Sequence, residues 1–175
     1  MHKKGLIQIY TGEGKGKTTL AVGQAVRAAG HGFRVCVIHF FKDPKLFPSG
    51  EDRILKKIGV RVMHLVPQHP KFCRNLKEGK IRKECLEALK CIRRIFKNKF
   101  DMLVVDEINI ALRDGFLKEK EIMSLLQDKP KGLNLVLTGR GISQSLIKKA
   151  DLVSEIRKVK HHFDKGICAR KAIEY

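Results

Sequence analysis

"TGEGKGKTTLAVG" (residues 11–23) is the stretch that decides the fold. It resembles the phosphate-binding pattern G-x-x-x-x-G-K-[ST], because it supplies G-K-T at residues 16–18. The leading glycine falls one position late, since Thr11 stands where the pattern has glycine and Gly12 follows it. The apolar run "LIQIY" (6–10) precedes this loop and a helical pattern follows it. A strand, a glycine-rich loop and a helix in this order predict a site for a phosphate-bearing ligand.

The residue types in this loop suit a triphosphate. Glycine allows positive φ and lets successive backbone N–H groups point at an anion, and the start of the helix adds about half a positive charge. Lys17 would neutralise phosphate oxygens, Lys15 adds a second cation, and the Thr18 hydroxyl is a ligand for Mg²⁺. The residues expected to bind the nucleotide in this loop are Gly12, Glu13, Gly14, Lys15, Gly16, Lys17, Thr18 and Thr19.

Apolar runs alternate with helical patterns along the rest of the chain. Several of these runs are apolar almost throughout, as parallel strands covered on both faces are. The alternation predicts a single domain over residues 1–175, of the α/β class, with a doubly wound, mostly parallel sheet of the P-loop NTPase-like (RecA-like) kind. We predict strands at 6–10, 33–40, 60–66, 101–107, 133–139 and 152–159, helices at 16–29, 77–97, 118–127 and 142–149, and loops at 42–53 and 67–75.

Two further segments place chemistry at the ends of predicted strands, where ligands bind in sheets of this class. "DMLVVDE" (101–107) closes an apolar strand on Asp106 and Glu107, and one of these carboxylates can hold Mg²⁺ against the phosphates. "LTGRG" (137–141) follows another apolar strand and brings Arg140 to the same edge of the sheet. These segments predict a site for a magnesium-bound nucleoside triphosphate, with ATP as the expected nucleotide.

Composition limits the class of protein. The chain has 175 residues and a net charge of +19, from 37 Lys and Arg against 18 Asp and Glu, and this field attracts nucleotides, nucleic acids and acidic proteins without choosing among them. It has no apolar run long enough to span a membrane and no signal-peptide pattern, so we expect a soluble, cytoplasmic protein. The five cysteines form no C-x-x-C pair and are expected to be reduced thiols. His64, His69 and Cys73 lack the second close-spaced pair that a tetrahedral metal site needs.

Taken together, these segments resemble the P-loop type of cob(I)alamin (corrinoid) adenosyltransferase over nearly the whole chain. The phosphate loop of that family is also one residue shorter than the standard pattern. The resemblance rests on "YTGEGKGKTTLA" (10–21), "GHGFRVCVIHFFK" (30–42), the P-x-G-E loop at 48–51, "DMLVVDEINIAL" (101–112) and "LTGRGISQSLIKKADLVSEIRKVKHHFDKGICARKAIEY" (137–175).

The resemblance implies transfer of the 5′-deoxyadenosyl group of Mg-ATP to Co(I) of a reduced corrinoid, which forms adenosylcobalamin and releases triphosphate. Co(I) is itself a strong nucleophile, so the enzyme has only to align the ribose C5′ with cobalt and stabilise the leaving triphosphate. The catalytic cations would then be Lys15, Lys17 and Arg140. Thr18 and Glu107 would hold Mg²⁺, with Asp106 behind them.

The resemblance also implies where the corrinoid and the partner proteins bind. The corrinoid would contact the loops at 42–51 and 64–75 and the helix after Glu107. Phe72 is the aromatic residue of the second of these loops, and the chain has no tryptophan. Glu13 stands where the family often has asparagine. A flavodoxin-like reductant and a homodimer are the implied partners, whereas a membrane and nucleic acid are not expected.

Two other functions would use the same phosphate loop. A small P-loop kinase or ATPase would release ADP in place of triphosphate. A basic, ATP-regulated nucleic-acid-binding module would bind DNA or RNA with an affinity that falls steeply with salt. Without the resemblance, the residues establish nucleotide binding and leave these alternatives open.

Overall fold

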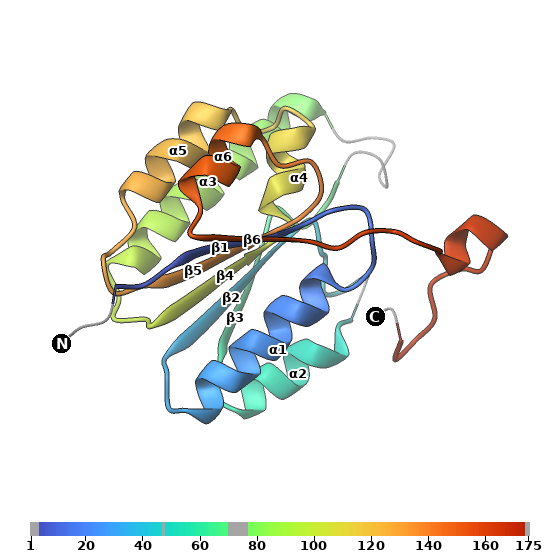
Figure 1. Cartoon of the computed structure of the whole chain (residues 1–175), viewed down its shortest axis with the longest axis horizontal. Helices are drawn as coiled ribbons and strands as arrows, with labels where there is room; N and C mark the ends of the chain where they lie inside the picture. The colour runs from blue at the N-terminus through green and yellow to red at the C-terminus, as the bar shows by residue number, and fades with distance from the viewer. Residues whose placement is uncertain (1–3, 47, 70–76, 174–175) are drawn as a thin grey trace.

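The computed structural model describes residues 4–46, 48–69 and 77–173. Over these residues the chain forms one six-stranded sheet in the order β3-β2-β4-β5-β1-β6, and every pair of neighbouring strands is parallel (Figure 1). The prediction of a parallel α/β sheet is therefore confirmed. The strands are β1 (Ile7–Thr11), β2 (Val35–Phe40), β3 (Arg61–Leu65), β4 (Met102–Asp106), β5 (Asn134–Thr138) and β6 (Leu152–Glu155).

Helices cover both faces of the sheet, so each face has its own apolar core (Figure 1). On one face, α1 (Lys17–Gly30) and α2 (Gly50–Lys57) pack residues such as Ala21, Ala25 and Leu55 against the strands. On the other face lie α3 (Glu78–Phe96), α4 (Ile108–Arg113), α5 (Glu119–Gln127) and α6 (Gln144–Lys149). No helix among the described residues has the length and apolar character to cross a membrane.

The predicted strands and helices are present among the described residues, but two predicted boundaries differ from the structure in an informative way. The strand predicted at 152–159 ends at Glu155, and the chain then passes the phosphate loop into an exposed arm that contains η1 (His162–Lys165). The prediction of a loop over 42–53 is wrong at its end, because α2 begins at Gly50. Acidic residues in the first turn of α2, basic residues in its last turn and the fully buried Leu55 stabilise this short helix. Most of the loop predicted at 67–75 lies outside the described residues.

An ion pair between α3 and α5 gives a prediction for stability against pH. Arg82 donates hydrogen bonds to Glu121, one of them with Nη1 to Oε2 at 2.6 Å, and these bonds hold the pKa of Glu121 at about 2. Because this pKa lies below the ordinary value of 4.5, the contribution is complete above pH 4.5 and is lost as the pH falls toward 2. We expect Glu121→Gln to lower the free energy of unfolding by only about 1 kcal/mol at pH 7, since the pair lies near solvent. The variant should also lose less of its free energy of unfolding than the wild type as the pH falls below 4.5. Urea unfolding at neutral and acidic pH measures this; an equal acid-induced decline in both proteins would contradict it.

Candidate functional site

The phosphate loop lies at the carboxyl edge of the sheet and closes around its own lysine. Residues 12–16 connect β1 to α1, and the Lys17 ammonium donates hydrogen bonds to the carbonyl oxygens of Gly12 and Gly14, both at 2.7 Å. Lys17 is buried, and this burial lowers its pKa although nearby carboxylates, Glu107 first among them, oppose the shift. The loop therefore holds a desolvated cation at its centre, where an incoming phosphate oxygen can replace the two carbonyls.

The glycines of the loop serve two different purposes. A Cβ atom at Gly12 would lie 2.5 Å from the carbonyl oxygen of Ile156, and one at Gly14 would lie 2.7 Å from that of Arg157. These two glycines therefore admit the segment that follows β6, which is tied to the loop by hydrogen bonds from Gly14 N to Ile156 O (2.7 Å) and from Ile156 N to Thr11 O (2.9 Å). Gly16 has a φ of +120°, and apart from its chain neighbours no atom of the described residues lies within 4 Å of where its Cβ would be. Gly16 thus leaves the helix start open to a ligand.

Asp106 ends β4 directly beside the start of α1. It is 1% exposed, and its Oδ1 accepts hydrogen bonds from the hydroxyls of Thr18 (3.0 Å) and Thr138 (2.6 Å). Burial by itself would raise the pKa of Asp106, but the charge of Lys42 and the hydrogen bond from His39 outweigh it and hold the pKa below its ordinary range. Asp106 is thus an anion fixed against the helix that carries the phosphate loop.

Glu107 follows in a strained backbone conformation and carries an unpaired buried oxygen. Its φ of 64° lies in the left-handed region, and its backbone N–H donates a hydrogen bond to Thr138 Oγ1 at 2.9 Å. Its Oε2 is buried and has no hydrogen-bond partner among the described residues. Burial, followed by repulsion from Asp106, raises the pKa of Glu107. Glu107 therefore has an unpaired buried carboxylate oxygen beside Asp106, and Asp106 in turn accepts the hydrogen bond of the Thr18 hydroxyl. Carboxylate and hydroxyl oxygens are the ligands that Mg²⁺ prefers, so these residues fit the metal.

The remaining predicted site residues lie at the exposed side of the loop or outside the described residues. Arg140 follows β5 and pairs with Glu13 across the mouth of the loop, with Nη1 2.9 Å from Oε2. Lys15 donates a hydrogen bond to the carbonyl oxygen of Ile173 at 3.3 Å, and Thr19 is exposed on the first turn of α1. Phe72 lies outside the described residues.

The Glu13 to Arg140 ion pair predicts a gain of affinity when it is broken. Glu13 places a negative charge at the mouth of an anion site and occupies the arginine expected to contact phosphate. We expect Glu13→Gln to tighten ATP binding about two- to fivefold at low salt and to lose this advantage at high salt, because both side chains are about half exposed. Calorimetry with ATP at two salt concentrations measures the effect. Asp164→Asn, which breaks the exposed pair with Lys158 in the arm, is the control, and weaker binding by Glu13→Gln would contradict the assignment.

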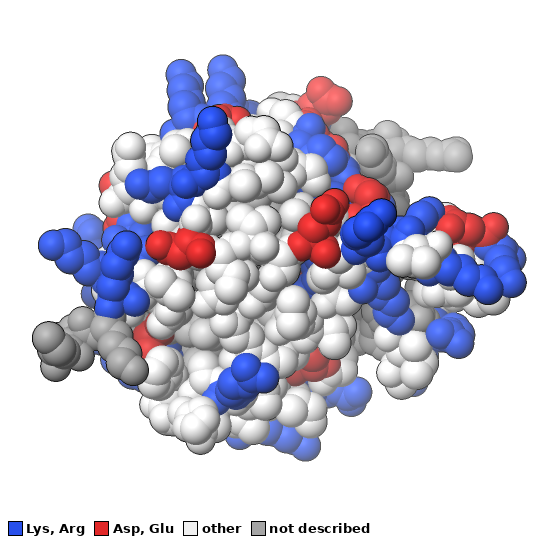
Figure 2. Space-filling view, in the orientation of Figure 1, with Lys and Arg blue, Asp and Glu red and all other residues white. Residues whose placement is uncertain are grey.

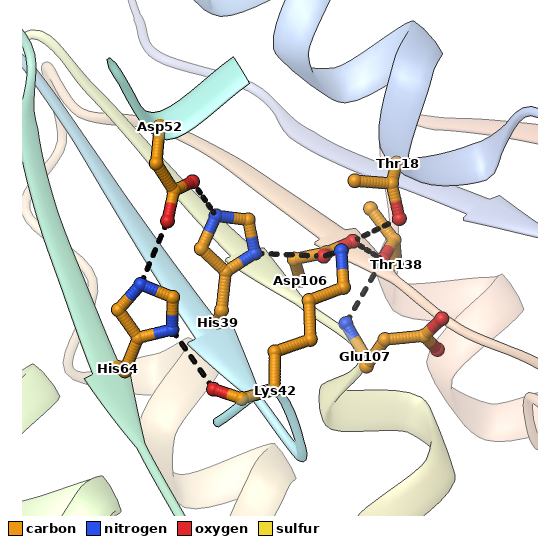
Figure 3. Close-up of polar contacts among 8 residues, drawn as sticks. All are labelled: Thr18, His39, Lys42, Asp52, His64, Asp106, Glu107 and Thr138. Atoms are coloured by element: carbon orange, nitrogen blue, oxygen red, sulfur yellow. Dashed lines mark hydrogen bonds and ion pairs between the residues drawn. The ribbon is translucent and has the colours of Figure 1, made fainter. Parts of the chain in front are cut away.

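Sequence reasoning missed a group of polar side chains that are linked to Asp106 through His39 and Lys42. Figure 3 shows His39 of β2, Lys42 of the following loop, His64 of β3 and Asp52 of α2 joined by hydrogen bonds and ion pairs. The only sequence signal was a histidine inside each of two apolar strands. His69 has a different partner, since its Nε2 lies 2.8 Å from Asp114 Oδ2 while its ring packs edge-on against Phe41.

A family model described as "ATP:corrinoid adenosyltransferase BtuR/CobO/CobP" matches residues 3–175. A protein of Escherichia coli (strain K12) named "Corrinoid adenosyltransferase" is 34% identical over 174 residues, which cover 99% of this chain and 87% of that protein. A protein of the same name from Pseudomonas aeruginosa (strain PAO1) is 30% identical over 174 residues, which cover 99% of this chain and 85% of that protein.

The solved structures support the fold independently. The crystal structure of the KaiC-like protein PH0186 from Pyrococcus horikoshii OT3 superposes with a TM-score of 0.59 at 20% identity, covering 88% of this chain and 73% of that one. At this level of identity the likeness concerns the fold, and it confirms the RecA-like arrangement predicted from the sequence.

Proposed function

Because the chain belongs to the ATP:corrinoid adenosyltransferase family, we propose that its phosphate loop grips the triphosphate of ATP while Co(I) of a reduced corrinoid attacks the ribose C5′. The chain is an enzyme that adenosylates corrinoids with ATP. The observation that carries the proposal is the match over residues 3–175, which includes the loop, the Asp106 and Glu107 pair and the T-G-R-G turn that the structure brings to one sheet edge.

In the proposed reaction the cobalt electron pair forms the Co–C5′ bond, and the C5′–O bond breaks with its electrons on the leaving triphosphate. No side chain has to accept a proton, so the task of the protein is alignment and charge stabilisation. Lys17 would exchange its two loop carbonyls for phosphate oxygens, and Lys15 and Arg140 would add charge from the rim.

Thr18 and Glu107 would hold Mg²⁺ through their side-chain oxygens, with Asp106 behind them, kept in place by its hydrogen bonds from Thr18 and Thr138. Mg²⁺ supplies neutralisation of the triphosphate charge when it is bound. Glu107 is the residue that would gain most from the metal, because its buried Oε2 would find a partner there. The comparisons do not favour the kinase, ATPase or nucleic-acid-binding alternatives.

A product analysis tests the proposed function. The protein is incubated anaerobically with Mg-ATP and chemically reduced cobalamin, and the products are separated by chromatography. We expect a light-sensitive adenosylcobalamin and an equal amount of inorganic triphosphate. ADP and phosphate in place of triphosphate would identify a phosphoryl-transfer enzyme, and the absence of an adenosylated corrinoid would overturn the proposal.

We also propose that an acidic, flavodoxin-like protein delivers the electron that makes Co(I). Support comes from the charge of +19 and from Figure 2, which shows Lys and Arg gathered over the C-terminal arm and around the rim of this face. Docking between opposite charges weakens as salt screens them. The rate with such a reductant should fall several-fold between about 50 and 300 mM NaCl, while the rate with a small chemical reductant stays constant. Equal salt dependence with both reductants would contradict docking.

A further inference from the structure

A closed ring of polar contacts lies near the carboxyl edge of the sheet, beside the phosphate loop (Figure 3). Asp52 of α2 contacts two histidines, with His39 Nε2 3.2 Å from its Oδ1 and His64 Nε2 2.8 Å from its Oδ2. His39 Nδ1 lies 2.9 Å from Asp106 Oδ2, and the Lys42 ammonium donates to the same oxygen at 2.9 Å. His64 Nδ1 completes the ring at 2.9 Å from the carbonyl oxygen of Lys42.

The backbone of the sheet dictates this alignment. His64, His39 and Asp106 are register partners on three neighbouring parallel strands, so their side chains form a row on one face. This is the face that α1 and α2 cover, and the preceding residues of β2 and β4 on it, Val37 and Val104, belong to the apolar core. Aliphatic residues would therefore fit the row.

Burying the charged and polar side chains of this ring costs desolvation free energy. His39 and Asp106 are each 1% exposed, and Asp52 is 6% exposed. Replacing such buried charged groups with apolar residues of similar size is often neutral or stabilising, so stability alone does not explain them. What distinguishes the ring is its contact with the carboxylate that faces the phosphate loop.

We propose that the Asp52 and His39 pair is a positioning device, which fixes the orientation of the Asp106 carboxylate and thereby sets the affinity of the site for metal-bound nucleotide. The proposal rests on the proposed function. Thr18 and Thr138 donate to Oδ1 of Asp106, while His39 and Lys42 contact Oδ2. Donors on opposite oxygens prevent the carboxylate from rotating about its terminal bond.

The two partners of Asp106 Oδ2, His39 and Lys42, differ in how firmly they are held. This difference makes His39 the residue that mainly fixes the orientation of the carboxylate. Lys42 carries its ammonium on a flexible chain that is 28% exposed, so it can turn toward an incoming phosphate. His39 is held more firmly, because it is buried, its ring stacks on His64 with centroids 5.2 Å apart, and its other nitrogen lies within ion-pair distance of Asp52, 3.2 Å from Oδ1. When Lys42 turns away, His39 remains to hold Oδ2.

Two substitutions of one residue separate positioning from packing. His39→Asn retains an amide donor near the place of Nδ1 and so can still bond Asp106, whereas His39→Gln places its amide near Nε2 and loses that bond. Asp52→Asn keeps the shape of the side chain and removes its charge. Glu121→Gln, which breaks the ion pair between α3 and α5, is the control for a general loss of stability.

The measurement is ATP affinity by calorimetry with Mg²⁺ and with EDTA, together with the melting temperature. We expect His39→Gln to reduce the gain in affinity from Mg²⁺ about tenfold with metal-free affinity nearly unchanged, Asp52→Asn to reduce it less, and His39→Asn to restore most of it. Glu121→Gln should lower the melting temperature without changing the gain.

The possible outcomes decide the proposal. If His39→Gln and Asp52→Asn both keep the wild-type gain in ATP affinity from Mg²⁺, the proposal is overturned. It is also overturned if His39→Gln and His39→Asn lose this gain equally, or if the ATP affinities with Mg²⁺ and with EDTA fall by the same factor. If His39→Gln does not fold, Asp52→Asn decides, because it conserves the packing around α2. A wild-type protein that binds ATP without any gain from Mg²⁺ would instead contradict the metal site of the proposed function.

Discussion

Replacing Lys17 with alanine is expected to lower kcat/KM for ATP about 10²- to 10³-fold, as removal of a preorganised donor to a developing charge does in other enzymes. The Lys17 ammonium is buried within the loop, where its attraction for phosphate oxygens is little screened by water. Its loss should weaken triphosphate binding and slow departure of triphosphate together. Steady-state kinetics with chemically reduced cobalamin and calorimetry with ATP measure the two effects.

Lys15→Ala is the matched control, since it removes the same charge from an exposed position in the same loop. We expect a loss of only a few-fold from this change, because solvent screens the exposed ammonium. Wild-type kinetics of Lys17→Ala would refute its role. Equal losses in the two variants would show that the overall charge of the loop matters and that the buried position does not.

Glu107→Gln is expected to have opposite effects on function and on stability. The concentration of Mg²⁺ needed for half-maximal activity should rise about tenfold or more, because a neutral amide is a weaker metal ligand than a carboxylate. The protein without nucleotide should become more stable, since burial and repulsion from Asp106 already disfavour the charge of Glu107. Titration of activity with Mg²⁺ and thermal unfolding without ligand measure the two quantities.

Asp106→Asn distinguishes the two carboxylates. This substitution removes the carboxylate charge that pairs with His39 and Lys42, so these two partners lose their counter-ion. We therefore expect Asp106→Asn to destabilise the protein, whereas Glu107→Gln stabilises it. An unchanged Mg²⁺ requirement in Glu107→Gln with a raised one in Asp106→Asn would assign the metal to Asp106. Lower stability in both variants would contradict the electrostatic cost assigned to the buried charge of Glu107.

The sheet could be predicted from the sequence because its strands are apolar and its helices are periodic. α3 shows this most clearly, since Ile81, Cys85 and Leu89 recur at intervals of four residues and all are buried. The short helix α2 was missed because Pro48 and Gly50 are typical of a loop. Its helical state depends on burial of Leu55 against the sheet, which no local pattern records.

The site was predictable only where its residues are contiguous. The loop and the pair Asp106 and Glu107 have recognisable spacing, and the structure brings them together. His39, Asp52 and His64 come from separate elements and meet only because β2, β3 and α2 are neighbours. The pairing of Glu13 with Arg140 likewise depends on the strand order, since β5 lies next to β1.

The place of β1 in the sheet has a consequence for how the molecule assembles. Its two neighbours are β5 and β6, so Ile7 pairs with Leu135 and Gln8 with Leu152, across most of the chain length. During synthesis the phosphate loop emerges early but acquires its flanking strands only after residue 155 has left the ribosome, and the entropy of closing so long a loop delays this step further. Nucleotide binding is therefore among the last properties that the growing chain acquires. A chain that ends before Leu152 would contain every residue of the loop but would lack β6, the strand that pairs with β1 beside the loop.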